Sequence, residues 1–126
     1  MDKLEWHLEA GEGRLKVNLA AGRMGTGIVV FLDNTGRHIG AVAVSEFDHK
    51  ENRASTSVMT LLGHKDDAVA YEAAHEICRR LRVPVAVIAG IHLDDIKAEE
   101  IGGIVSNARE AVKKFVALVE THPKTL

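Results

Sequence analysis

The sequence predicts an α+β fold in which an antiparallel β-meander is followed by a β-α-β-α arrangement. Two observations carry this prediction. Apolar residues recur at every second position over most of the first half, which is the period of a strand. From about residue 66 they recur every three or four positions, which is the period of a helix on a core. The chain has 126 residues, 46% hydrophobic and 27% charged, so we expect one globular domain over residues 1–126 with a flexible tail at 121–126.

A hairpin is expected at the beginning of the chain. Leu4, Trp6 and Leu8 alternate with polar residues, and residues 15–19 alternate again after a turn that contains two glycines. Two such runs around a glycine turn indicate paired antiparallel strands. Residues 22–27 hold three glycines and are expected to break the pattern, as a flexible loop or as backbone that approaches a flat ligand.

Three more strands are expected before the change of period. Residues 28–32 are a continuous apolar run, which is typical of a strand buried on both faces. The sequence Asp-Asn-Thr-Gly at 33–36 predicts a hairpin turn, so residues 38–44 should return beside 28–32. Residues 54–62 carry β-branched side chains at alternate positions and form the fifth predicted strand.

The second half predicts helix, strand and helix. A helix is expected over residues 66–82, with acidic residues in its first turn, arginines in its last and Pro84 ending it. Residues 85–89 are a compact apolar strand, and a second helix is expected from about residue 97 to 120. Gly102 and Gly103 near its beginning predict either a close backbone approach or a later helix start. The two helices should pack on one face of the sheet.

Charge and cysteine content exclude several classes of protein. A net charge of −2 and a pI of about 6.4 argue against a nucleic-acid-binding protein. The single cysteine, Cys78, excludes an internal disulfide framework. No apolar stretch is long enough to span a membrane, and the beginning of the chain lacks the apolar region of a signal peptide. We therefore expect a soluble cytoplasmic protein.

Two similar segments lie where a strand is expected to lead into a helix. They are Gly63-His64-Lys65-Asp66-Asp67 and Gly90-Ile91-His92-Leu93-Asp94-Asp95. If the fifth and last strands are parallel neighbours, both segments lie at the carboxyl edge of the sheet, where such sheets bind ligands. Two helix N-termini and Lys65 would then suit a phosphate, and His64 and His92 should lie close enough to share a ligand.

Other interpretations of these segments stay open. The aspartates can simply complement the helix dipoles, and His64, His92 and Asp94 could instead supply a metal with two nitrogens and an oxygen. Whether a metal is bound is unknown from the sequence. No catalytic residue is predicted, because Cys78 lies in the apolar helix stripe and no serine has a nucleophile-elbow motif around it.

The order of several short motifs resembles that of the LpdD-like family, small proteins associated with UbiD-type decarboxylases. The motifs are Arg23-Met24-Gly25, His38-Ile39-Gly40-Ala41-Val42-Ala43, Gly63-His64-Lys65-Asp66 and Gly90-Ile91-His92-Leu93-Asp94, then Glu99-Glu100-Ile101 and Asn107. The resemblance covers about residues 6–119. Lys97 departs from it, since a serine or threonine helix cap is expected there and Asp95 could take over that role.

The resemblance implies a fold similar to the proteasome assembly chaperones three and four, and a homodimer. It also implies a non-catalytic chaperone that binds reduced prenylated flavin mononucleotide (prenylated FMN) and hands it to a UbiD-type decarboxylase. The cofactor-binding residues that it implies, together with the two junction segments, are Arg23, Met24, Gly25, His38, Gly63, His64, Lys65, Gly90, His92 and Asp94.

Two alternative functions remain open at this point. One is a non-catalytic assembly protein in which the histidines are structural. The other is a small accessory subunit of a metal- or flavin-dependent decarboxylase. A homodimer is also expected from the residues themselves, because the apolar run 28–32 needs cover on both faces of the sheet and two helices cover only one.

Overall fold

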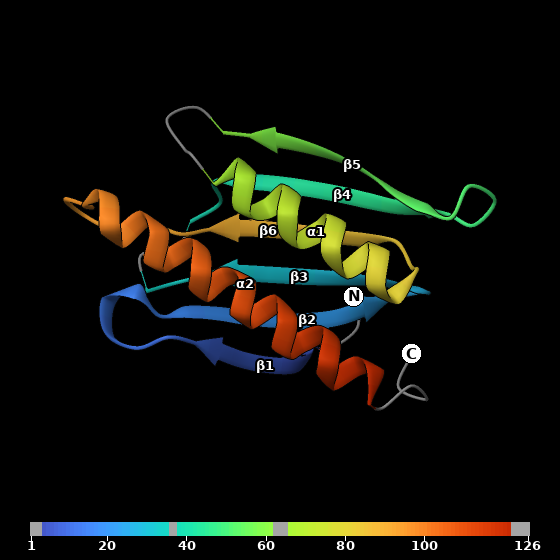
Figure 1. Ribbon diagram of the computed structural model, residues 1–126, viewed down its shortest axis with the longest axis horizontal. Helices are drawn as coiled ribbons and strands as arrows, with labels where there is room; N and C mark the ends of the chain where they lie inside the picture. The colour runs from blue at the N-terminus through green and yellow to red at the C-terminus, as the bar shows by residue number, and fades with distance from the viewer. Residues whose placement is uncertain (1–3, 36–37, 62–65, 122–126) are drawn as a thin grey trace.

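The computed structural model describes residues 4–35, 38–61 and 66–121. These residues form one six-stranded sheet with two α-helices on one face (Figure 1), so the predicted α+β class is confirmed. The strands are β1 (Leu4–Ala10), β2 (Val17–Met24), β3 (Gly27–Asp33), β4 (Ala41–Asp48), β5 (Arg53–Thr60) and β6 (Val85–Gly90). The helices are the short 3-10 helix η1 (Gly13–Leu15), α1 (Asp67–Leu81) and α2 (Ala98–Glu120).

The order of the strands corrects one detail of the predicted meander. The sheet has the order β1-β2-β3-β6-β4-β5, so β6 lies between β3 and β4. The expected hairpin between residues 28–32 and 38–44 is therefore wrong. β6 runs parallel to β3 and antiparallel to β4, and the chain after β3 crosses the end of β6 to reach β4. An apolar strand such as β6 gains most from this central position, where both of its edges are paired.

The condition that the fifth and last strands are parallel neighbours is not met, because β4 separates β5 from β6. Both of them pair antiparallel with β4, so they still run in the same direction. β3 has this direction too. The carboxyl ends of all three strands consequently lie at one end of the sheet, at the left of Figure 1.

Glycines explain one other departure from the predicted elements and bear out one of the two alternatives given for the second helix. β2 continues through Met24, and the glycine-rich segment forms only the tight turn to β3, with Gly25 at φ +61°. Gly102 and Gly103 both lie inside α2. A Cβ atom on Gly103 would lie 2.8 Å from Leu15 Cδ1, which is the predicted close approach.

The core lies between the sheet and the helices. α1 buries the predicted stripe of Ala70, Ala73, Ala74, Ile77 and Cys78, and α2 buries Ile104, Ala108, Ala111, Val112, Phe115, Val116 and Val119. Trp6 on β1 meets Phe115 edge to face, with ring centroids 5.4 Å apart. Burial raises the pKa of the Cys78 thiol, which disfavours the reactive thiolate. No helix among the described residues is long and apolar enough to cross a membrane.

Candidate functional site

The candidate site lies at the carboxyl ends of β3 and β6, where the chain passes from β3 to β4. A Cβ atom on Gly90, the last residue of β6, would lie 2.1 Å from the carbonyl oxygen of His38. Only a glycine leaves room for this crossing of two backbone segments. The crossing brings His38 and His92, which are 54 positions apart in the sequence, to one place.

Two exposed imidazoles form the centre of the site. The rings of His38 and His92 meet edge to face, with centroids 5.5 Å apart. His92 Nε2 lies 3.0 Å from Asp94 Oδ1, so three of the predicted cofactor-binding residues lie together. The His92 side chain is 52% exposed, and a ligand from solvent can therefore reach this ring.

Asn34 holds the backbone of His92 in place, a role that sequence reasoning missed. The Asn34 side chain donates to the carbonyl oxygen of His92 at 2.9 Å and accepts the His92 amide at 3.1 Å. Asn34 is 2% exposed, so the pair of hydrogen bonds is protected from water. The sequence placed Asn34 in a hairpin turn, where an asparagine is common, and only the insertion of β6 gives it this partner.

The Asp66 side chain contacts the backbone on which the site is built. It precedes α1, and its Oδ2 accepts the amide of Ile91 at 3.4 Å. A Cβ atom on Gly40 would lie 1.9 Å from the same oxygen. Gly40 therefore leaves room for a buried carboxylate, and Asp66 does more than complement the helix dipole.

Arg23, Met24 and Gly25 lie at the opposite end of the sheet. Met24 pairs with Gly27, and Ile28 is level with Val85 at the beginning of β6. A seven-residue strand separates the two ends by roughly 20 Å. Within one chain these three residues cannot share a ligand with His38 and His92, which corrects the single grouping expected from the sequence.

Local contacts explain the residues of this distant turn. Arg23 forms an ion pair with Glu5 at 2.9 Å, and its guanidinium lies over the ring of Trp6, 5.5 Å from the centroid. Gly25 supplies the positive φ of the turn. Gly63, His64 and Lys65 lie outside the described residues, so the expected approach of His64 to His92 stays a prediction.

The described residues hold no group of three or more His, Cys, Asp and Glu side chains that could bind a metal ion. His92 and Asp94 are close, but the sequence-based set of ligands needs His64 as well. Among the described residues, His38 is the ring neighbour of His92. These two imidazoles can donate hydrogen bonds to an anion or a carbonyl oxygen.

Arg14, in the first half of the chain, binds the segment that follows His92. Arg14 of η1 binds the Glu100 carboxylate at 2.7 Å and the carbonyl oxygen of Asp94 at 2.8 Å. Glu100 also accepts the Lys97 amide at 3.0 Å, which satisfies the helix start without the role expected of Asp95. These hydrogen bonds from Arg14 and from the Lys97 backbone lower the pKa of Glu100 from 4.5 to about 2.

The shifted pKa of Glu100 predicts how stability depends on pH. As pH falls from 4.5 to about 2, the unfolded chain takes up the proton first, so the stabilisation from this carboxylate is present above pH 4.5 and lost over that window. The urea midpoint of the wild type should fall more steeply between pH 5 and 2.5 than that of Glu100→Gln. Glu99→Gln, one residue away, serves as the control and should follow the wild type. Parallel curves for the wild type and Glu100→Gln would contradict this role.

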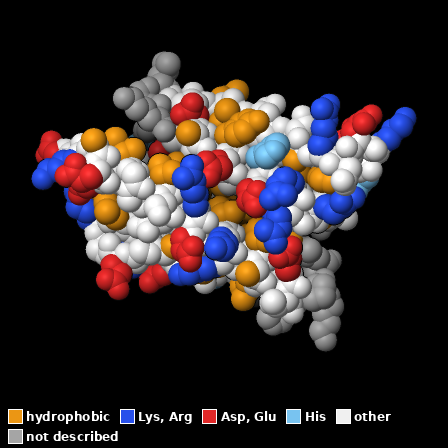
Figure 2. Space-filling view, viewed as in Figure 1, with side chains coloured by type: hydrophobic (Ala, Val, Ile, Leu, Met, Phe, Trp, Pro, Cys, Tyr) orange, Lys and Arg blue, Asp and Glu red, His pale blue; other side chains and the backbone are white. Residues whose placement is uncertain are grey.

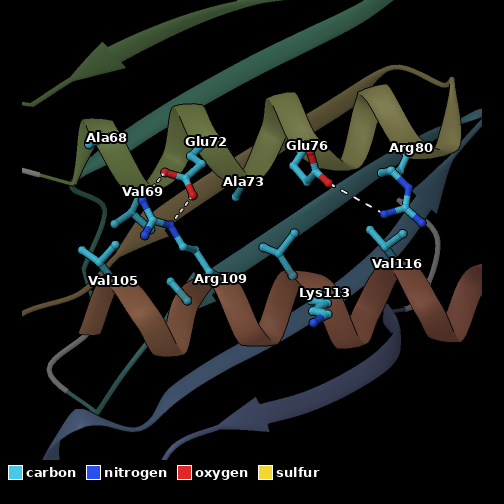
Figure 3. Close-up of a pocket in the computed structure, with 12 residues that line it drawn as sticks. Ala68, Val69, Glu72, Ala73, Glu76, Arg80, Val105, Arg109, Lys113 and Val116 are labelled. Atoms are coloured by element: carbon cyan, nitrogen blue, oxygen red, sulfur yellow. Dashed lines mark hydrogen bonds and ion pairs between the residues drawn. The ribbon is translucent and has the colours of Figure 1, made fainter. Parts of the chain in front are cut away.

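Away from this site, a hollow of about 410 Å³ lies between α1 and α2 on the helix-bearing face (Figure 3). Its floor is apolar, and charged side chains of both signs gather around it (Figure 2). Arg109 pairs with Glu72 across the hollow, and Arg80 pairs with Glu120 at 2.9 Å. These ion pairs link the two helices, and none of the residues predicted to bind a cofactor lines this hollow.

Comparison with known proteins gives one family and one fold. The prenylated flavin chaperone LpdD-like domain matches residues 11–120. A similar solved structure, described as "Crystal Structure of a Novel Chaperone Complex for Yeast 20S Proteasome Assembly", has a TM-score of 0.58 and 16% identity over 92% of this chain and 95% of that one. At this identity the likeness concerns the fold alone. A comparison with curated proteins finds no match.

Proposed function

Because the chain belongs to the prenylated flavin chaperone LpdD-like family, we propose that it is a non-catalytic chaperone for reduced prenylated FMN. In this proposal the protein binds the reduced cofactor and delivers it to a UbiD-type decarboxylase. The observation that supports it most is the pair of exposed imidazoles, His38 and His92, held together by Gly90 and Asn34 at the end of the sheet.

The residues at this end of the sheet fit the polar part of the cofactor. Imidazoles donate hydrogen bonds to phosphate oxygens, and α1 begins at Asp67, so its N-terminus belongs to the same end of the sheet. Lys65 directly precedes Asp66 in the sequence and is expected to add a positive charge. The buried Asp66 carboxylate accepts the Ile91 amide, and its proposed role is structural.

Transfer of cofactor to an apo-decarboxylase tests the proposed function. An apo UbiD-type enzyme is mixed anaerobically with reduced prenylated FMN, with or without this protein, and decarboxylation is followed over time. We expect faster or more complete activation when the protein is present, and no turnover of an aromatic acid by the protein alone. Turnover by the isolated chain would instead support an accessory enzyme subunit, and unchanged activation would support a pure assembly protein.

The proposed chaperone is a homodimer, and the uncovered face of the sheet supports this state. Both helices lie on one face (Figure 1). On the other face the register places apolar residues side by side across four strands. They are Val29, Phe31, Val42, Val44, Met59, Ala86 and Ile88, and Val44 and Met59 are 55% and 71% exposed. A contiguous apolar surface of this kind is typical of a protein interface.

A charge on this face is expected to separate the subunits. Val44→Glu would place a carboxylate among apolar side chains, and burial of an unpaired charge is strongly unfavourable. In light scattering at micromolar concentration, the wild type should have twice the chain mass of 13.7 kDa and the variant the mass of one chain. Leu118→Glu, at an exposed position on α2, is the control and should stay dimeric. A wild type that is already monomeric would contradict the dimer.

A further inference from the structure

The two edges of the sheet differ in their protection against pairing with another strand. β1, at one edge, carries Glu5, His7 and Glu9 and has an irregular register near its beginning. β5, at the other edge, has eight residues with a single charge, at Arg53, and contains no proline, lysine or glycine. Charges, prolines and bulges are the usual features that prevent edge-to-edge pairing. β5 is thus the open edge.

The register identifies which backbone groups of β5 face outward. Leu61 donates its amide to Gly40 at 2.8 Å, and the next pair along the ladder is Thr60 with Ala41. Hydrogen-bonded and non-hydrogen-bonded pairs alternate along an antiparallel ladder. The N–H and C=O groups that point away from β4 therefore belong to Ala54, Thr56, Val58 and Thr60.

A cleft of about 550 Å³ lies beside this edge, between β5 and α1, which are neighbours in Figure 1. Its α1 wall contains Tyr71 and His75, whose rings stack with centroids 5.8 Å apart. His75 Nδ1 lies 2.8 Å from Thr56 Oγ1, and this oxygen lies 2.7 Å from the buried Ser45 Oγ. The chain of polar contacts fixes α1 against β4 and β5, so the cleft is formed before any partner arrives.

The charges around the cleft indicate what kind of side chain it accepts. Asp67, Glu72 and Glu76 line it, and the described lining residues include no lysine or arginine. Glu72 and Glu76 are already paired with Arg109 and Arg79, whereas Asp67 lies in the first turn of α1. A carboxylate-rich lining favours a basic side chain from a partner.

We propose that β5 accepts an extended segment of a partner protein as an additional strand of the sheet. The backbone of the segment would pair with the outward groups of β5, and its alternate side chains would enter the cleft, with a lysine or arginine among them. This interaction is separate from flavin binding, and neither proposal depends on the other.

The test uses a phage-displayed library of random peptides of about twelve residues as the probe, selected on the full-length protein. Enriched peptides should alternate β-branched residues with positions that carry lysine or arginine. A synthetic enriched peptide should slow hydrogen exchange at the amides of Ala54, Thr56, Val58 and Thr60. Val58→Pro removes one outward N–H and should weaken binding about tenfold or more, whereas Val58→Thr keeps the N–H and should change affinity less than about threefold.

Methylation of the peptide gives a second test that leaves the protein unchanged. Methyl groups on the peptide amides that face β5 should abolish binding, and methyl groups on the amides of the opposite edge should not. Equal binding by both methylated peptides would overturn the proposal, as would protection of amides elsewhere, for example along the hollow between α1 and α2. Hydrogen exchange without peptide gives a further outcome. If protection of the β5 amides rises with protein concentration, the edge pairs with a second copy of this chain, and the proposal is overturned.

Discussion

Gly90→Ala is expected to lower the free energy of unfolding by about 3 kcal/mol and the melting temperature by about 10 °C. The added methyl group would lie 2.1 Å from the carbonyl oxygen of His38 and 2.8 Å from its carbonyl carbon. Both atoms are backbone, so no flexible side chain can move aside. The crossing between β6 and the segment before β4 must open, which also separates His38 from His92. Urea and thermal unfolding monitored by circular dichroism measure the loss.

Gly102→Ala is the matched control for this prediction. A Cβ atom at Gly102 would have no neighbour within 4 Å, and the residue lies exposed in α2. Alanine should therefore stabilise the protein by about 0.5–1 kcal/mol, because glycine loses more backbone entropy in a helix. Similar stabilities for Gly90→Ala and the wild type would show that the two backbone segments do not cross closely at Gly90.

The double variant His38→Ala, His92→Ala is expected to weaken binding of reduced prenylated FMN on the order of a hundredfold. A hydrogen bond to a charged group contributes about 1.5–3 kcal/mol, and 1.4 kcal/mol corresponds to one decade of affinity. Each single variant should therefore weaken binding about tenfold or more. Both histidines are exposed, so the change in unfolding free energy should stay within about 0.5 kcal/mol. Anaerobic titrations followed by the flavin absorbance measure these affinities.

His49→Ala provides the control for the histidine variants. His49 is exposed and follows β4, whose carboxyl end lies at the opposite end of the sheet from that of β6. The His49→Ala variant should bind the reduced cofactor as tightly as the wild type does. If the double variant also binds as tightly as the wild type, the cofactor site lies elsewhere, and the distant turn at Arg23 becomes the next candidate.

The periodicity of the sequence predicted the elements but not the order of the strands. The apolar stripe and Pro84 placed the first helix within one residue of its observed ends at both termini. Strand order depends on which apolar strand takes the centre of the sheet, and β3, β4 and β6 are all apolar enough to do so. The turn residues Asp33 and Asn34 correctly mark the end of β3. The same residue types begin a tight hairpin turn and a longer connection that crosses another strand, so they do not tell the two apart.

Part of the candidate site could be predicted because a glycine at the end of a strand often marks a place with no room for a Cβ atom. Gly90 before His92 marks a place where backbones meet, and the structure supplies His38 as the partner. Arg23 is included on the family resemblance, and the glycines beside it do not show at which end of the sheet their turn lies. Asn34 and Asp66 could not be found in this way, since short polar residues at the ends of strands and helices usually serve only as caps.

Titration of the wild-type protein with reduced prenylated FMN under anaerobic conditions tests the proposed function most directly. We expect saturable binding, and weaker binding of the dephosphorylated cofactor, because the imidazoles and the beginning of α1 are assigned to the phosphate. Absence of saturable binding to the reduced cofactor would contradict the proposed chaperone function. Binding that is equally tight with and without the phosphate would contradict the site at His38 and His92.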